Sequence, residues 1–267
     1  MIKRLRFLAL AIFVLPAALG GGLVSCGIET YKYLQYVDPG IPMTLNTTAY
    51  ISLPGGQPYY FRYFIIYYRI YISDFSTTGS VDAGMLAQIN PALYTDYNYF
   101  YSYTNTQSAV APTSMGDTFA NRKYFPLELD KASGTSIESI LSDTGGGVIT
   151  LEFAANPQFK PSLVMGNLQN ETPGLPFERY QLSRNTRNNN PYAGNNYFVN
   201  SDDVNNGDHI SSDSTNTNQD VQNSPQTITG TKYTYVSMYI LAHGMDDSNF
   251  TNIFSIPTFI GVFRLPD

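Results

Sequence analysis

The chain is poor in the residue types that build most metal, disulfide and nucleic-acid sites. Its 267 residues include no Trp, 1 Cys and 2 His, and 15 Lys and Arg against 21 Asp and Glu give a net charge of −6. A disulfide framework needs at least two cysteines, a multi-histidine metal site needs more histidine, and a nucleic-acid surface needs clustered cations. The sequence therefore predicts no cofactor and no nucleic-acid partner.

Aromatic side chains are abundant instead. The chain has 22 Tyr and 16 Phe, and 43% of its residues are hydrophobic while only 13% are charged. Tyr and Phe are enriched in strands, and this apolar content is sufficient for a folded core. The composition therefore predicts a mainly β protein that folds.

The N-terminus has the pattern of an export signal. Lys3, Arg4 and Arg6 precede an apolar run over residues 7–19, which is too short to span a bilayer comfortably. The run is followed by Leu-Val-Ser-Cys at residues 23–26, which resembles the lipobox of bacterial lipoprotein precursors. The resemblance implies that residues 1–25 are a cleaved signal peptide and that Cys26, the only cysteine, carries diacylglycerol. The alternatives are an ordinary secretory signal or an uncleaved anchor.

Lipidation at Cys26 would make a membrane the first partner of the mature chain. Two or three acyl chains, palmitate among them, hold a protein on a bilayer stably, whereas one is marginal. Gly27 follows the lipidated position, where an Asp can act as an inner-membrane retention signal in some bacteria. The expected location is the cell envelope, with the outer membrane favoured over the inner. Cleavage removes cations only, so the mature chain is still more acidic, which argues against charge-driven adhesion to anionic lipid.

The mature chain divides by composition into four parts. Residues 26–58 form the lipidated N-terminus and first strands, and residues 59–79 with 227–267 hold the strongest strands. Residues 80–182 are predicted as a mixed α and β insertion, and residues 183–226, rich in Asn, as a flexible loop. The expected strands are 44–52, 59–73, 148–153, 231–242 and 257–265; the expected helices are 80–90 with Ser80 as cap, 91–103 and 136–142; and the expected turn regions are 105–120 and 244–252.

Two segments resemble strands of a fibronectin type III or related immunoglobulin-like sandwich. The first, residues 63–73, reads FIIYYRIYIS after a leading Tyr, and the second, residues 233–257, reads YTYVSMYILAHGMDDSNF and ends in IFSIP. The resemblance implies a sandwich in which these two strands are neighbours. Residues 80–226 are more than that fold needs between them, so they would form a large insertion or a second lobe.

Strand parity predicts two contrasting faces, because successive side chains point to opposite sides. The even positions from Phe64 to Ile72 and from Val236 to Ala242 are apolar and form the expected core face. The opposite face, here called the tyrosine face, consists of Tyr63, Tyr67, Tyr71, Tyr235 and Tyr239. Two interpretations stay open at this stage: residues 80–182 cover it as a second core, or it is an exposed binding face for a protein or glycan.

Catalytic and metal-binding motifs are weak. His209 and His243 lie in no nucleophile or zinc motif. Nominal carboxylate pairs of the kind that glycosidases use occur at Glu128 with Asp130 and at Glu171 with Glu178, a spacing common by chance. Oxygen ligands at calcium-like spacing are Asp202, Asp203, Asn205 and Asp208, without the Gly and distal Glu of an EF-hand. A solvated acidic loop is the competing interpretation.

These observations favour a lipid-anchored bacterial envelope protein with a β-sandwich of immunoglobulin or fibronectin type III type. The expected role is a non-catalytic binding or structural module with protein or glycan partners. The alternatives are an envelope enzyme or accessory domain acting on glycans, and a lipoprotein subunit of a larger envelope complex.

Overall fold

The computed structural model describes residues 32–38, 48–77, 81–105, 113–130, 134–142, 146–153, 161–184, 198, 220–222 and 231–265. The described helices and strands all belong to one compact unit, Tyr33–Asp267. Cys26 and the signal peptide lie outside the described residues, as do most of residues 183–226. The calcium ligands predicted there also lie outside: Asp202, Asp203, Asn205 and Asp208.

The strands form two sheets. The first is antiparallel, in the order β1 (Thr48–Leu53), β5 (Gly147–Glu152), β6 (Ser162–Met165), β7 (Arg179–Ser183) and β4 (Glu128–Leu129). The second is centred on the antiparallel pair β2 (Phe61–Ser73) and β9 (Tyr233–Asp246). β10 (Thr251–Phe254) and β11 (Thr258–Arg264) pair with the free edge of β9, while β3 (Phe125–Pro126) and the parallel β8 (Val221–Gln222) pair with that of β2.

The helices are α2 (Ala83–Ile89), α3 (Pro91–Asn105), α4 (Met115–Asn121), α5 (Ile137–Ile140) and the 3₁₀ turn η2 (Leu168–Asn170). α2 begins where the Asp82 carboxylate accepts the N–H of Met85, so Asp82 rather than Ser80 caps the predicted helix. Pro91 opens α3, the position where a missing N–H is tolerated. α4 lies in a range expected to be turns, because a seven-residue helix shows little periodicity.

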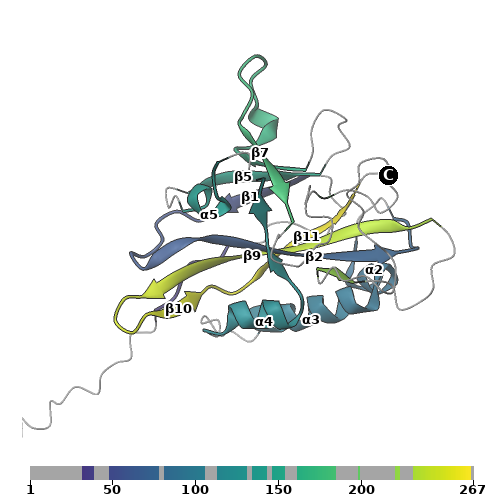
Figure 1. Ribbon diagram of the computed structural model, residues 1–267, viewed down its shortest axis with the longest axis horizontal. Helices are drawn as coiled ribbons and strands as arrows, with labels where there is room; N and C mark the ends of the chain where they lie inside the picture. The colour runs from purple at the N-terminus through teal and green to yellow at the C-terminus, as the bar shows by residue number, and fades with distance from the viewer. Residues whose placement is uncertain are drawn as a thin grey trace, which may run out of the picture. The chain divides into compact units, whose positions relative to one another are not determined.

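The elements stack in three layers: sheet, sheet and helices (Figure 1). The main core fills the space between the sheets, where Phe64, Ile66 and Ile240 of the second sheet meet Leu151 and Leu163 of the first. α2, α3 and α4 cover the other face of the second sheet. The mainly β, sandwich-like fold and its core face are therefore as predicted.

The predicted division of the chain is corrected in one respect. Residues 80–182 were expected to be an insertion beside a sandwich formed by residues 59–79 and 227–267. They supply α2 to α4, but they also supply β4, β5 and β6, which are strands of the first sheet. The range therefore completes the sandwich as well as covering it.

Near the end of the chain, β10 and β11 pair one after the other with the same edge of β9. β9 continues to Asp246, beyond the predicted start of a turn, and the turn occupies only residues 247–250 before β10. Between β10 and β11, the N–H of Ala242 donates to the Ser255 hydroxyl, and the N–H of Ser255 donates to the Ala242 carbonyl. Ser255 thus keeps the edge bonded where Pro257 offers no N–H.

Candidate functional site

The tyrosine face is assembled as predicted but is buried. β2 and β9 place Tyr67 opposite Tyr239 and Tyr71 opposite Tyr235. These four side chains are 8%, 1%, 0% and 0% exposed, and Tyr63 is half-buried. The expectation of an exposed binding face is therefore wrong for these four residues, and the interpretation as a second core describes the structure.

Residues of α3 and α4 cover this face. The Phe119 ring stacks on Tyr67 at 4.3 Å between centroids and on Phe100 at 4.3 Å, and Phe100 contacts Tyr239 at 4.7 Å. The physical reason is area: five tyrosine rings on one sheet face expose apolar surface that an amphipathic helix layer removes from water. Most aromatics predicted to cover the face do so, whereas Tyr94 and Tyr101 of α3 stay 38% and 49% exposed.

A buried carboxylate ties the helices to the sheet. Asp96 of α3 is 4% exposed and accepts hydrogen bonds from Arg69 Nη1 at 2.7 Å, Arg122 Nη1 at 2.6 Å and the Tyr71 hydroxyl at 2.8 Å. Each of the two oxygens therefore has an arginine partner, which compensates for the loss of water around the charge. The Tyr71 hydroxyl also bonds Tyr124 at 3.0 Å.

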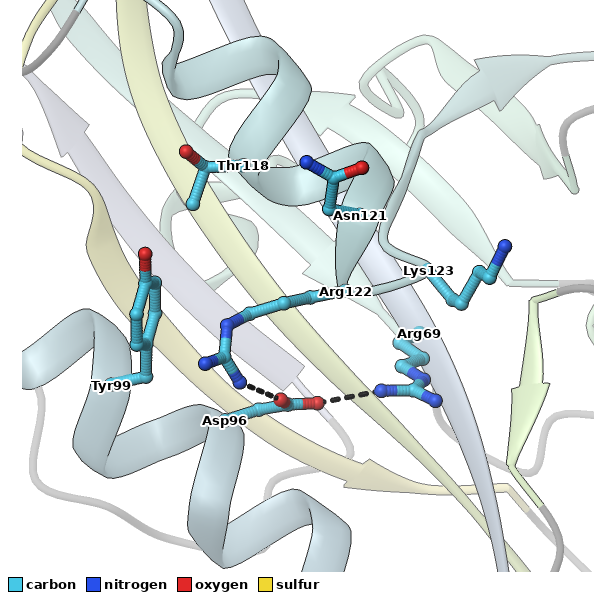
Figure 2. Close-up of a pocket in the computed structure, with 7 residues that line it drawn as sticks. All are labelled: Arg69, Asp96, Tyr99, Thr118, Asn121, Arg122 and Lys123. Atoms are coloured by element: carbon cyan, nitrogen blue, oxygen red, sulfur yellow. Dashed lines mark hydrogen bonds and ion pairs between the residues drawn. The ribbon is translucent and has the colours of Figure 1, made fainter.

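A cleft of about 510 Å³ opens beside Asp96 and its two arginine partners (Figure 2). Its lining residues come from β2, from α3, and from α4 with the residues after it: Arg69, Asp96, Tyr99, Thr118, Asn121, Arg122 and Lys123. Figure 2 shows Arg69 and Arg122 approaching Asp96 from opposite sides. Three cations thus line the cleft with one carboxylate, although the whole chain has a net charge of −6. The cleft has a local excess of positive charge.

The two arginines keep unused hydrogen-bond donors. Arg122 donates to Asp96 through Nη1, and its guanidinium lies 3.5 Å from the centroid of the Tyr99 ring. Arg69 is 8% exposed and donates to Asp96 and, at 2.6 Å, to Gln222 Oε1. Its Nε is buried and has no hydrogen-bond partner among the described residues. A buried donor without a partner is uncommon in folded proteins.

Lys123 has an unusual backbone. Its φ is +61°, the left-handed conformation in which a helix commonly ends on Gly, and its N–H bonds the Ala120 carbonyl. A side chain in this conformation costs on the order of 1 kcal/mol. A cation after a helix also interacts favourably with the helix dipole. The chain nevertheless keeps a lysine where glycine would be less strained, at the rim of the cationic cleft.

Of the other residues singled out from the sequence, His209 lies outside the described residues, while Glu171, Glu178 and His243 have structural roles. Glu171 accepts two hydrogen bonds from Arg179, at 2.8 and 2.9 Å, and Arg179 lowers the pKa of that carboxyl. Glu178 accepts the Tyr180 hydroxyl. His243 lies within β9, not after it; burial lowers its pKa, and its ring bonds Asn252 at 3.1 Å. Within the described ranges, no group of three His, Cys, Asp or Glu side chains could hold a metal ion.

Sequence reasoning did not find the cleft. Arg69, Asp96 and Arg122 are separated along the chain, and nothing in their local patterns brings them together. One usable signal was Arg69 itself, the only charged residue within the apolar run from residue 63 to residue 72. A charged residue within an apolar strand needs a partner from elsewhere in the fold if its face of the strand is covered.

Comparison with known proteins gives no relative from which the fold or the cleft could be interpreted. No family model, no curated protein and no solved structure matches the chain. The resemblances to a lipobox and to fibronectin type III strands therefore remain predictions. Among the residues that the structure describes, no helix is long and apolar enough to cross a membrane. The class that the fold and the site define is a three-layer β-sandwich protein with a cationic cleft between its helices and its sheet.

Proposed function

We propose that the chain is a lipid-anchored bacterial envelope protein whose non-catalytic domain binds an anionic group of a glycan or protein. The anchor is Cys26, and the binding site is the cleft at Arg69, Arg122 and Lys123. The observation that carries the binding role is the excess of positive charge around a single, already bonded carboxylate, in a chain that is acidic overall.

A carboxylate is the anion that suits this cleft best. A guanidinium presents several N–H donors in a planar fork that matches a carboxylate, and Arg122 uses only Nη1 on Asp96. Tyr99 and Asn121 add a ring edge and an amide beside the cations, which suits a ligand with hydroxyl groups next to its charge. Uronic-acid sugars and acidic peptides both have a carboxylate of this kind.

A binding role is favoured over glycan hydrolysis by the composition of the cleft. Glycosidases of the common type need two carboxyl groups that flank the scissile bond. Asp96 is the one carboxylate that lines the cleft, and both of its oxygens accept from arginines. Among the described residues, the lining therefore lacks the pair of carboxyl groups that such hydrolysis requires.

Binding is tested by calorimetry with a uronic-acid oligosaccharide, its neutral counterpart and a glutamate-rich peptide. We expect the neutral sugar not to bind and K123Q to weaken binding of the acidic ligand about tenfold, since a charge-assisted hydrogen bond contributes roughly 1.5–3 kcal/mol. R122Q should abolish binding. The matched control is R264Q, which also removes a guanidinium stacked on a tyrosine, 4.4 Å from the Tyr233 centroid, but outside the cleft.

Two results would contradict the binding role: equal affinity for the acidic and the neutral sugar, or no binding of either carboxylate ligand. A preference between the sugar and the peptide assigns the ligand to glycan or protein. Because R122Q also breaks an ion pair with Asp96, its melting temperature is compared with that of K123Q before its affinity is interpreted.

The anchor is tested separately. Wild-type protein expressed in a bacterial host should incorporate a labelled palmitate analogue and fractionate with membranes. C26A should take up no label and be released. S25A, which keeps a small residue before the cysteine, serves as the matched control and should behave as wild type. Unchanged membrane retention of C26A would contradict lipidation at this residue.

A further inference from the structure

Four large aromatic side chains are exposed at one end of the second sheet. Tyr33, Tyr36, Tyr59 and Phe250, here called the aromatic end, are 58%, 52%, 77% and 77% exposed. The Tyr60 hydroxyl accepts the N–H of Tyr33 and donates to its carbonyl, and the Tyr59 and Tyr60 rings are 5.2 Å apart. The segment before β1 and the start of β2 therefore lie side by side.

The turn between β9 and β10 lies at the same end (Figure 1, left). The N–H of Met245 donates to the Tyr60 carbonyl at 2.9 Å, and Arg62 forms an ion pair with Asp247 at 2.8 Å. Phe250 is the last residue of that turn. Tyr33, Tyr59 and Phe250 thus belong to the end of the sheet where β2 begins and β9 finishes, and Tyr36 follows on the same segment as Tyr33.

The backbone that carries these rings is held in place by the core. Leu34 and Val37 are 3% and 1% exposed and belong to the main core, so the residues between and beside them face outward. The Gln57 side chain bonds the Gln35 backbone on both sides, with the Gln35 N–H donating to Gln57 Oε1 and Gln57 Nε2 donating to the Gln35 carbonyl. The tyrosines are therefore presented by a fixed segment, which lowers the entropy lost on contact.

Phe250 occupies a position that other residues would fill with less strain. Its φ is +57°, and its N–H bonds the Asp246 carbonyl at 2.7 Å. A bulky residue in the left-handed region is an outlier, whereas Gly or Asn adopts it readily. The ring is also 77% exposed, so packing within the domain does not explain it. A strained, exposed phenylalanine at a turn indicates a contact outside the domain.

We infer that the aromatic end docks on the lipid surface to which Cys26 anchors the chain. This inference rests on the proposed lipidation. Six residues lie between Cys26 and Tyr33, and the seven Cα–Cα steps that join them span at most about 25 Å. The tether therefore keeps Tyr33, and with it the aromatic end, within reach of the bilayer.

The chemistry of the aromatic end suits a headgroup interface. Tyrosine has an apolar ring with a hydroxyl that stays in water, and aromatic residues are enriched at membrane–water boundaries. Arg62 is neutralised by Asp247, and the Asp246 carboxylate accepts the N–H and hydroxyl of Ser248. The end therefore carries no excess of cations for anionic lipid, and its carboxylates limit it to shallow insertion. Weak insertion is sufficient, because the anchor makes it an intramolecular event.

The absence of Trp from the chain allows a direct test with single-Trp reporters. F250W and Y59W place the fluorophore at the aromatic end, and Y101W on α3, 49% exposed, is the matched control. Each full-length lipidated protein is reconstituted in phosphatidylcholine vesicles whose acyl chains carry bromine close to the glycerol. We expect F250W and Y59W to emit at shorter wavelength and to lose about twofold in intensity relative to unbrominated vesicles, with Y101W unchanged.

Flotation of the same samples separates the two proposals. If the proteins float with the vesicles while F250W and Y59W behave as Y101W does, docking is overturned and the anchor stands. If the wild type does not float, or floats no better than C26A, the anchor is overturned, and the docking inference fails with it. Quenching of all three reporters alike would also overturn docking at this end, because it would place α3 equally close to the lipid.

Discussion

Arg184 donates two parallel hydrogen bonds to Asp220, from Nε to Oδ2 at 2.8 Å and from Nη2 to Oδ1 at 2.6 Å. The pair is buried, with side chains 4% and 1% exposed. The Tyr68 hydroxyl donates to the same carboxylate, and the Asp220 carbonyl accepts the N–H of Ile70. Because the two residues stand at either side of residues 185–219, the pair fixes both ends of that long segment against β2.

Breaking this pair should be strongly destabilising. D220N leaves the Arg184 guanidinium buried without its counter-charge, and removing one partner of a buried ion pair typically costs about 3–5 kcal/mol. Replacing both residues by apolar ones, in R184M/D220M, should cost less than D220N alone because no buried charge remains. Urea unfolding of the wild type and the two variants measures the difference. A D220N protein within about 1 kcal/mol of wild type would show that water reaches the pair.

Two buried tyrosines should respond in opposite ways to loss of their hydroxyl. The Tyr239 hydroxyl is buried without a hydrogen-bond partner among the described residues, whereas that of Tyr124 bonds Tyr71 and Ser237. Y239F should raise the free energy of unfolding by about 1 kcal/mol, and Y124F should lower it by about 1 kcal/mol. Both variants keep the ring stack, so each is the control for the other in thermal and urea unfolding. Equal losses in both would mean that Tyr239 has an unseen partner.

The tyrosine face should make the fold sensitive to alkali. Burial, with smaller contributions from Tyr63 and Asp117, raises the pKa of Tyr67 to about 12, and burial also raises the pKa of Tyr71 and Tyr239 well above the usual value for tyrosine. A tyrosine whose pKa is higher in the folded protein than in the unfolded chain contributes stability that is complete below pH 10. That stability is lost as pH rises from 10 toward the folded pKa.

Absorbance at alkaline pH measures this effect. After a jump from neutral pH to pH 12, exposed tyrosines should ionise at once, and the buried ones only as the domain unfolds. The free energy of unfolding should fall steadily above pH 10. A single fast phase that includes all tyrosines, with the fold retained, would contradict the burial of this face.

The sequence predicted what depends on local pattern and missed what depends on distant contacts. Alternation identified both faces of β2 and β9, because side-chain parity is a property of each strand alone. Whether the tyrosine face was covered could not be decided, since that depends on where α3 and α4 fold back. The two-residue strands β3, β4 and β8 are too short to show a period.

The cleft and the aromatic end were missed for the same reason. Asp96 meets Arg69 and Arg122 only because α3, β2 and the end of α4 converge. Phe250 is unremarkable in the sequence, and only its positive φ and exposure single it out. Both features depend on backbone placement that composition and periodicity do not contain.

Lys123 allows the backbone and the charge to be tested separately. K123N supplies a residue that tolerates the left-handed conformation, while K123A keeps the strain, so K123N should be more stable than K123A by about 1 kcal/mol. Both remove the ammonium group from the cleft rim, so both should bind the acidic oligosaccharide equally weakly, about tenfold below wild type. Chemical unfolding and calorimetry on the same preparations give the two quantities. Equal stability would mean that residue 123 does not hold this conformation in solution, whereas wild-type affinity in both variants would remove Lys123 from the binding site and leave the arginines to account for it.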